Sequence, residues 1–172
     1  RRIMDEGRIL LVDLSKGRIG EDVATLFGAL LVSAIGLTAL GRADQPAAGR
    51  RPFFLYLDEF QSFTTLSLAG MLAELRKYGV SLTLAHQYCA QLQPEIRDAV
   101  LGNVGTLIAF RVGTADAEVL APEFAPTFGP EDLTRLANHE IYVRLLVDGA
   151  VAAPFSGRTF PLPGRDSLCR SA

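Results

Sequence analysis

The sequence predicts an α/β fold in which a mainly parallel sheet is flanked by helices. Strand-like and helix-like segments alternate along the chain. Four of the strand-like segments are continuously apolar, which is typical of strands that are buried on both faces of a parallel sheet. Polar residues follow several of these strands directly, at the edge where parallel sheets bind ligands. With 172 residues, the chain is long enough for one domain with its own core.

The N-terminal part predicts a strand at residues 8–13 and a long helix at residues 23–41. The helical segment is uncharged and about long enough to span a bilayer. A stripe of small or polar residues recurs in it at helical spacing: Thr25, Ala29, Ser33 and Gly36. Such a stripe fits a helix pressed between a sheet and another subunit, and it also fits a membrane helix. We favour the first interpretation because strands are predicted close by on both sides; a membrane protein anchored by residues 23–41 is the alternative.

The central part predicts two further strands with a helix between them. Residues 53–57 (FFLYL) form an apolar run that is closed by two acids. Residues 68–78 have helical periodicity, and Gly79 is well placed to end that helix. Residues 80–85 (VSLTLA) predict the next strand.

The C-terminal part predicts short helices, one strand and a β-hairpin. The helices are expected at residues 94–101, 115–120 and 131–136, and the strand at residues 106–112. The hairpin is expected at residues 141–153, with a tight turn at Asp148-Gly149. We predict one domain over residues 1–154 and an extended tail over residues 155–172.

Composition restricts the function only loosely. Hydrophobic residues make up 49% of the chain and charged residues 21%, which is ordinary for a globular protein. The net charge of −2 gives no overall signal for nucleic acid, so DNA contact would have to be local. Cys89 and Cys169 lack CxxC spacing, which indicates free thiols in a reducing compartment. The chain opens with charged residues, and no signal peptide is visible in it; because it also lacks an initiator Met, we expect a fragment of a longer protein.

The most informative residues are Asp58 and Glu59, which directly follow the FFLYL strand. Hydrolysis of a nucleoside triphosphate needs Mg²⁺ placed against the phosphates and a group that orients the attacking water. Asp58 is the candidate metal ligand, and Glu59 is the candidate that polarises the water. The simpler alternative is that the two acids only begin a solvated loop.

Two further residues could serve the same reaction. Gln87 follows the next strand, where its amide can donate to a γ-phosphate; the alternative is a polar residue that ends a strand. Arg76, near the end of the intervening helix, could stabilise negative charge on the transferring phosphoryl group. The alternative for Arg76 is a solvated cation at a helix C-terminus. Arg97 and Arg111 are weaker candidates for that role.

These residues resemble a known family when they are taken together. The runs LDEFQSF, LAELRKYGVSLTLAHQYCAQL and NVGTLIAFRVGTADAEVLAPEF are similar to those of HerA/FtsK-type P-loop motor ATPases. The resemblance is strongest to type IV secretion coupling proteins (TraD/TraG-like) and conjugative-transfer ATPases, and it extends from about Gly7 to Pro154. It implies the C-terminal half of a RecA-like P-loop NTPase core, with a C-terminal β-hairpin.

The resemblance also implies roles and partners. Asp58 and Glu59 correspond to the Walker B pair, Arg76 to the arginine finger and Gln87 to the glutamine sensor. The implied cofactors are ATP and Mg²⁺, and the implied assembly is a homo-hexamer that performs ATP-driven DNA translocation in conjugation or type IV secretion. Secretion-channel or relaxosome proteins are further implied partners. The implied location is cytoplasmic, with parts outside this chain as the means of reaching the cytoplasmic face of the bacterial inner membrane.

One motif of the family is absent from this chain. No GxxxxGK[ST] loop occurs in the sequence, so the Walker A portion is expected in a missing N-terminal part, and this chain alone is expected to bind ATP weakly or not at all. Without that part, we expect exposed apolar surface and self-association. The other classes are a non-catalytic RecA-like assembly or docking module and an unrelated metal-dependent hydrolase. The hydrolase is disfavoured because His86 and His139 lack ligand-like spacing.

Overall fold

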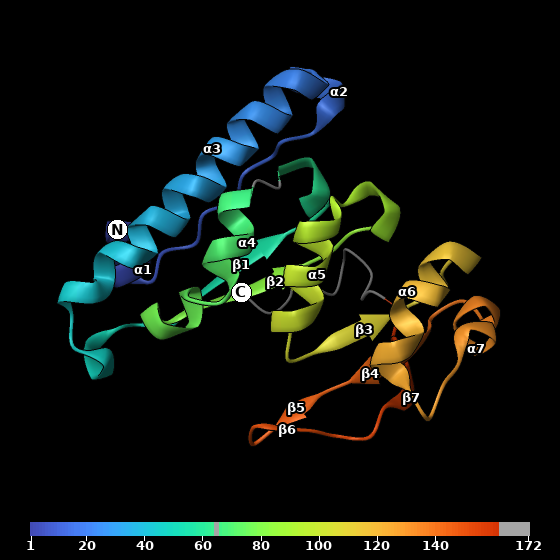
Figure 1. The fold of residues 1–172 in the computed structure, drawn as a ribbon. Helices are drawn as coiled ribbons and strands as arrows, with labels where there is room; N and C mark the ends of the chain where they lie inside the picture. Colours follow the sequence, from blue (N-terminus) through green and yellow to red (C-terminus); the bar gives the residue numbers. More distant parts are fainter. Residues whose placement is uncertain (64–65, 162–172) are drawn as a thin grey trace. The chain divides into compact units, whose positions relative to one another are not determined.

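The computed structural model describes residues 1–63 and 66–161 of the chain (Figure 1). Contacts group the residues into two compact units, Arg1–Asn103 and a second unit that begins at Val104. Among the described residues, the first unit has one sheet and the second has two, and each unit has its own buried residues. The prediction that residues 1–154 fold as one domain stays a prediction.

The first unit contains most of the helices. Its α-helices are α1 (Arg2–Glu6), α2 (Lys16–Ile19), α3 (Glu21–Leu40), α4 (Leu66–Leu72) and α5 (Pro94–Asn103). Its 3₁₀ helices are η1 (Gly41–Asp44), η2 (Ala47–Gly49), η3 (Phe60–Phe63), η4 (Leu75–Tyr78) and η5 (Cys89–Gln91). The helix predicted over residues 68–78 is therefore divided into α4 and η4. Gly79 ends η4 in the left-handed conformation, at a φ of 73°, as the sequence predicts.

The first sheet consists of two parallel strands, β1 (Phe53–Leu57) and β2 (Val80–Leu84), as predicted. Phe53, Leu55 and Leu57 alternate with exposed neighbours and pack with residues of α3, α4 and η4. The other face of β1 carries Phe54 and Tyr56, whose exposed fractions are 61% and 71%. Parallel sheets are usually covered on both faces, whereas on this face Phe54 and Tyr56 of β1 are exposed, beside Ser81 and Thr83 of β2.

Helix α3 packs on this unit through small side chains. Its buried residues recur at three- and four-residue spacing: Ala24, Gly28, Val32, Gly36 and Ala39. Of the stripe expected from the sequence, only Gly36 lies on this buried face, because the contact face is rotated from the predicted one. Large apolar side chains of α3 remain exposed on its outer face: Val23, Leu26, Phe27, Leu30 and Leu37. Residues 21–44 form the one described segment that is long and apolar enough to cross a membrane. The mean hydropathy of its apolar stretch is 2.2, and 28% of that stretch is buried.

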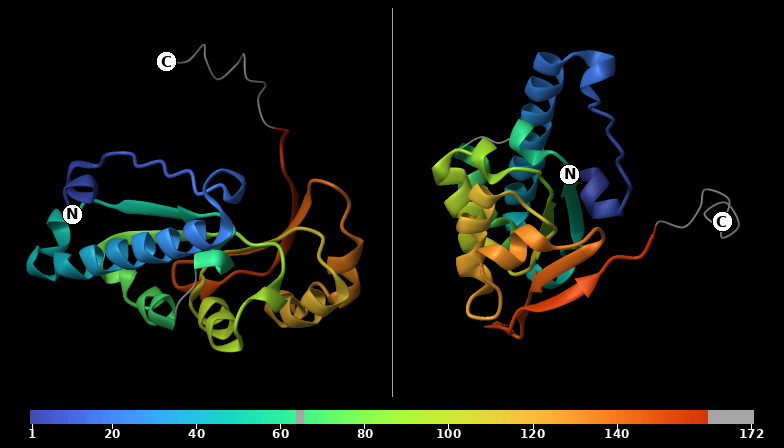
Figure 2. Two further views of the ribbon diagram at one scale, coloured as in Figure 1. Left: turned by 90° about the horizontal axis from the view of Figure 1, so that it is seen from above. Right: turned by 90° about the vertical axis from the view of Figure 1, so that its right-hand side faces the viewer.

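The strand predicted at residues 8–13 is not formed. These residues have no regular secondary structure and connect α1 to α2 along the length of α3 (Figure 2). Ile9 and Leu11 are 88% and 89% exposed. The prediction is wrong for the described chain because a strand needs a hydrogen-bonded neighbour, and β1 pairs only with β2.

The second unit is built on an antiparallel sheet. Its strands are β3 (Leu107–Ala109), β4 (Glu140–Arg144) and β7 (Phe155–Arg158), in the order β3-β4-β7. Helices α6 (Thr114–Phe124) and α7 (Pro130–Arg135) connect β3 to β4. The core of the unit includes Phe124 and Leu133, which are fully buried, and Val143 of β4.

A hairpin extends from β4. Strands β5 (Leu146–Val147) and β6 (Ala150–Val151) pair around Asp148 and Gly149, whose φ angles of 50° and 81° are those of a tight hairpin turn. The predicted hairpin is thus confirmed. Residues 155–158 of the expected tail form β7, because their backbone groups pair with β4.

The α/β class is confirmed, and the mainly parallel sheet is not. Among the described residues, parallel pairing is confined to β1 and β2, and the larger sheet is antiparallel. The apolar run of residues 106–112 pairs with the chain segment that returns after α6 and α7, which lies antiparallel to it. Apolar composition predicts burial of a strand but does not reveal its partner.

Candidate functional site

The candidate site lies where β1 and β2 end side by side. Parallel strands bring their carboxyl ends to the same edge of the sheet. Here the two segments that leave the strands stay bonded to each other, because Ala85 N donates to Leu57 O at 2.9 Å and Phe60 N donates to Ala85 O at 3.1 Å. Residues 58–60 are therefore held beside residues 85–87.

Phe60 fixes the loop that carries the two acids. Its side chain is fully buried and meets the ring of His86 edge-on, with 5.2 Å between ring centroids. Glu59, which precedes Phe60, has a φ of 50°, a left-handed conformation that costs a non-glycine residue about 1–3 kcal/mol. The buried ring and the bond from Phe60 N oppose relaxation of this conformation. Backbone strain of this kind is found at functional sites.

The Glu59 carboxylate receives two amide donors. Gln87 Nε2 donates to Oε1 from the loop after β2. Gln61 Nε2 donates to Oε2 at 2.5 Å from the 3₁₀ turn after Glu59 itself. The structure therefore brings together Glu59 and Gln87, which the sequence predicts as one site, and adds Gln61.

Asp58 is exposed beside Glu59. Its Oδ1 accepts a hydrogen bond from Glu59 N at 3.0 Å. Among the described residues, no group of three or more His, Cys, Asp or Glu side chains is arranged to hold a metal ion. Mg²⁺ is commonly bound by one or two carboxylates, with waters and substrate phosphates as its other ligands. A site with Asp58 as its protein ligand fits that mode of binding.

Arg76 lies away from this cluster. It belongs to η4, which comes before β2, whereas Gln87 follows the same strand. The five residues of β2 lie between Arg76 and Gln87, and at 3.3 Å per residue this strand alone is about 15 Å long. The Arg76 side chain is exposed and forms no ion pair with a described residue. Its predicted role as an arginine finger stays a prediction.

The other candidate arginines have local partners. Arg97 pairs with the neighbouring Asp98 at 2.9 Å, and Arg111 donates to Asn138 Oδ1 at 3.4 Å in the second unit. Neither contact involves a residue of the candidate site.

Gln61 is the site residue that the sequence analysis missed. The sequence feature that could have identified Gln61 is its position two residues after Glu59, in the segment that directly follows the two acids. The amide reaches back to the carboxylate because η3 begins at Phe60 and turns the chain at once. Nothing in the residue pattern alone predicts that turn.

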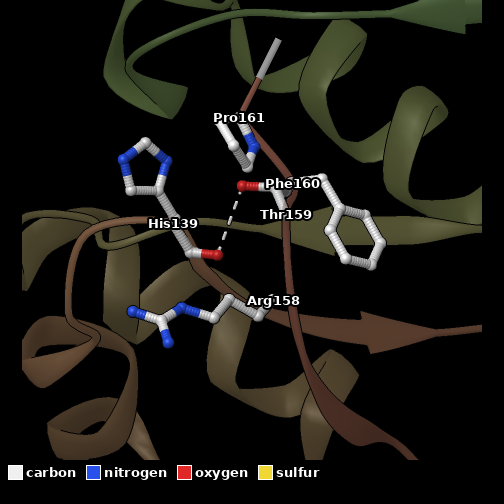
Figure 3. A pocket seen from close by; sticks show the side chains of 5 residues that line it. All are labelled: His139, Arg158, Thr159, Phe160 and Pro161. Atoms are coloured by element: carbon white, nitrogen blue, oxygen red, sulfur yellow. Dashed lines mark hydrogen bonds between the residues drawn. The ribbon is translucent and has the colours of Figure 1, made fainter. Parts of the chain in front are cut away.

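A separate pocket lies in the second unit. Its volume is about 350 Å³, and it is lined by His139, Arg158, Thr159, Phe160 and Pro161 (Figure 3). Thr159 Oγ1 and Thr159 N donate to His139 O at 3.3 and 2.8 Å, which ties the loop before β4 to the residue after β7. None of the predicted site residues lines this pocket.

Solved structures of a plasmid coupling protein share the fold. TrwB in complex with ADP and Mg²⁺ matches with a TM-score of 0.61 and 17% identity, over 85% of this chain and 40% of that one. TrwB in complex with a non-hydrolysable ATP analogue matches with a TM-score of 0.59 and 18% identity, over 78% and 38%. The GTP-analogue complex of TrwB gives the same values. This chain thus spans about two fifths of the length of these relatives.

Sequence comparison assigns the family. No curated protein matches the chain at a significant level. The family model described as "TraM recognition site of TraD and TraG" matches residues 52–141, which include both strands of the first sheet and the loops that follow them. That match covers more than half of the sequence. The chain therefore belongs to the TraD/TraG-like family of type IV coupling proteins.

Proposed function

We propose that this chain is the Walker B and sensor half of a RecA-like ATPase that drives DNA translocation in conjugation or type IV secretion. The observation that carries the proposal is the contact between Glu59 and Gln87 at the carboxyl ends of two parallel strands. A carboxylate that can orient water and an amide that can donate to phosphate converge there, as hydrolysis of a nucleotide requires. The family match supports the role in conjugative transfer.

Each residue has a distinct role in this proposal. Glu59 orients the attacking water, Asp58 holds Mg²⁺, and Gln87 donates to the γ-phosphate. When bound, Mg²⁺ neutralises charge on the phosphates. TrwB has been solved with a non-hydrolysable ATP analogue and with ADP and Mg²⁺, which supports ATP and Mg²⁺ as the cofactors here.

The uncovered face of the first sheet supports a missing Walker A portion. Phe54 and Tyr56 expose large apolar surfaces, and both β1 and β2 have an edge without a described neighbour. A further strand and helix from another part of the protein would pair with an edge and cover this face. Without them, we expect the chain to self-associate and to bind ATP weakly or not at all.

The proposed assembly places Arg76 at the nucleotide of a neighbouring subunit in a homo-hexamer. The exposed guanidinium and its distance from Glu59 within one chain support a role in trans. The further proposed partners are DNA, channel proteins and relaxosome proteins, the last in line with the TraM recognition that the family model's description names. The proposed location is the cytoplasmic face of the bacterial inner membrane.

The second candidate is a non-catalytic RecA-like assembly or docking module of a conjugation apparatus. The family model's description, which names TraM recognition, favours it. The paired amides on Glu59 disfavour it, because a docking surface does not require an oriented carboxylate.

The deciding experiment measures ATP turnover with Mg²⁺ and DNA on the full-length protein and on its Glu59→Gln variant. We expect the parent to hydrolyse ATP and the variant to lose at least about 100-fold in kcat. An active parent whose Glu59→Gln variant is equally active would refute the role of Glu59. An inert parent would favour the docking module.

A further inference from the structure

We propose that Gln61 is a positioning residue that holds the Glu59 carboxylate in place during ATP hydrolysis. This inference rests on the proposed function of the same site. It concerns the amide at 2.5 Å from Glu59 Oε2, to which neither the family match nor the sequence assigns a role.

The two amides on Glu59 come from different parts of the site. Gln87 is exposed and reaches Glu59 from the loop after β2. Gln61 is half-buried and lies in η3, the turn that begins directly after Glu59. Gln61 therefore moves with the backbone that carries Glu59, whereas Gln87 belongs to a separate segment.

This difference matters once a nucleotide is bound. In the proposed mechanism the Gln87 amide also donates to the γ-phosphate, so the phosphate competes with Glu59 for its two N–H groups. Gln61 is a donor with no assigned contact to the phosphate, and it limits rotation of the carboxylate. Misplacement of a catalytic group by about 1 Å can lower the rate about 100-fold.

The turn that carries Gln61 is well anchored. Phe60 is fully buried, Ser62 N donates to Glu59 O at 3.0 Å, and Phe60 N bonds across to Ala85. The position of the Gln61 backbone relative to Glu59 is therefore fixed before ligand binds. An anchored neighbour can orient the carboxylate at a small entropic cost.

The test measures kcat and KM for ATP in the full-length protein. Gln61→Met keeps the size of the side chain and removes the amide donor; Gln91→Met, at an exposed position in η5, is the matched control. We expect Gln61→Met to lower kcat about tenfold or more with KM changed less than twofold, and Gln91→Met to leave both unchanged. Gln61→Glu should lose more, because a second carboxylate cannot donate and repels Glu59.

A second comparison separates positioning from a general structural effect. In a Glu59→Gln background, Gln61→Met should leave the residual kcat unchanged within about twofold, because the group it positions is gone. An equal loss in both backgrounds, or a Gln61→Met variant as active as the control, would overturn the inference and leave the proposed function intact. If Gln61→Met lowers the melting temperature, kcat is measured at a temperature at which the parent and both single variants remain folded. A parent without ATP turnover would overturn the proposed function and this inference with it.

Discussion

Gly28 offers a sharp test of how α3 packs on the first unit. A Cβ added at Gly28 would lie 2.2 Å from Phe63 Cδ1 and 2.4 Å from Cε1, far inside normal contact distance. The ring is part of η3, the same turn that carries Gln61. Gly28→Ala must therefore displace either the helix or the ring.

Two effects of the substitution oppose each other. Alanine stabilises a helix by about 1 kcal/mol relative to glycine. Overpacking a fitted contact costs about 1–3 kcal/mol. The net expectation is a loss of up to about 2 kcal/mol in the free energy of unfolding. Gly36→Ala should lose less, since the atoms at 2.1 and 2.8 Å belong to the flexible side chain of Met71.

Gly102 is the matched control because it is also helical and has no atom within 4 Å of an added Cβ. Gly102→Ala should gain up to about 1 kcal/mol. Urea unfolding followed by circular dichroism measures both variants, and the midpoints are comparable when the m-values agree. If Gly28→Ala stabilises the protein as much as Gly102→Ala does, the close approach of α3 to Phe63 is refuted. In a Phe63→Ala background, Gly28→Ala should become stabilising.

Further predictions concern the second unit and the outer face of α3. Burial, with smaller contributions from Asp132 and Glu140, raises the pKa of Tyr142. The contribution of Tyr142 to stability is therefore present below the unfolded pKa of about 10 and lost as pH rises above it. Tyr142→Phe should reduce the fall of the urea midpoint at alkaline pH, and an unchanged fall would contradict this. Arg144 and Glu123 pair at 2.7 Å with side chains 14% and 25% exposed, so Glu123→Gln should cost about 1–3 kcal/mol by urea unfolding, and a change below about 0.5 kcal/mol would argue against the pair. Leu30→Ser should change the free energy of unfolding by less than about 0.5 kcal/mol and reduce binding of an apolar dye, because Leu30 is exposed on the outer face of α3. Unchanged dye binding would contradict the exposure of this face.

The candidate site was largely readable from the sequence. Asp58 and Glu59 follow an apolar strand, and Gln87 follows the next one, so a parallel pair of strands places all three at one edge. The structure adds the contact between Glu59 and Gln87 and the strained backbone of Glu59. It also separates Arg76 from the cluster within one chain, because η4 lies at the opposite end of β2.

The fold was predicted less completely. Local signals were reliable where they act within a few residues: the uncharged run gave α3, Gly79 ended η4, and Asp148-Gly149 formed the hairpin turn. Signals that depend on a distant partner in the chain were not reliable. Residues 8–13 have the pattern of a strand but pair with no strand among the described residues. The strand at Leu107–Ala109 joined an antiparallel sheet.

The sequence by itself determined the α/β class, the two parallel strands and the residues that end them, because side-chain periodicity and turn chemistry are encoded locally. Only the tertiary structure decided which face of α3 is buried, since that depends on the shapes of Phe63 and Met71 opposite Gly28 and Gly36. Only the tertiary structure also places the Gln61 amide against the Glu59 carboxylate, through a turn that is fixed by the burial of Phe60 and by a hydrogen bond to Ala85. Such contacts join residues whose spacing along the chain carries no periodic signal, and packing is the physical reason that they form.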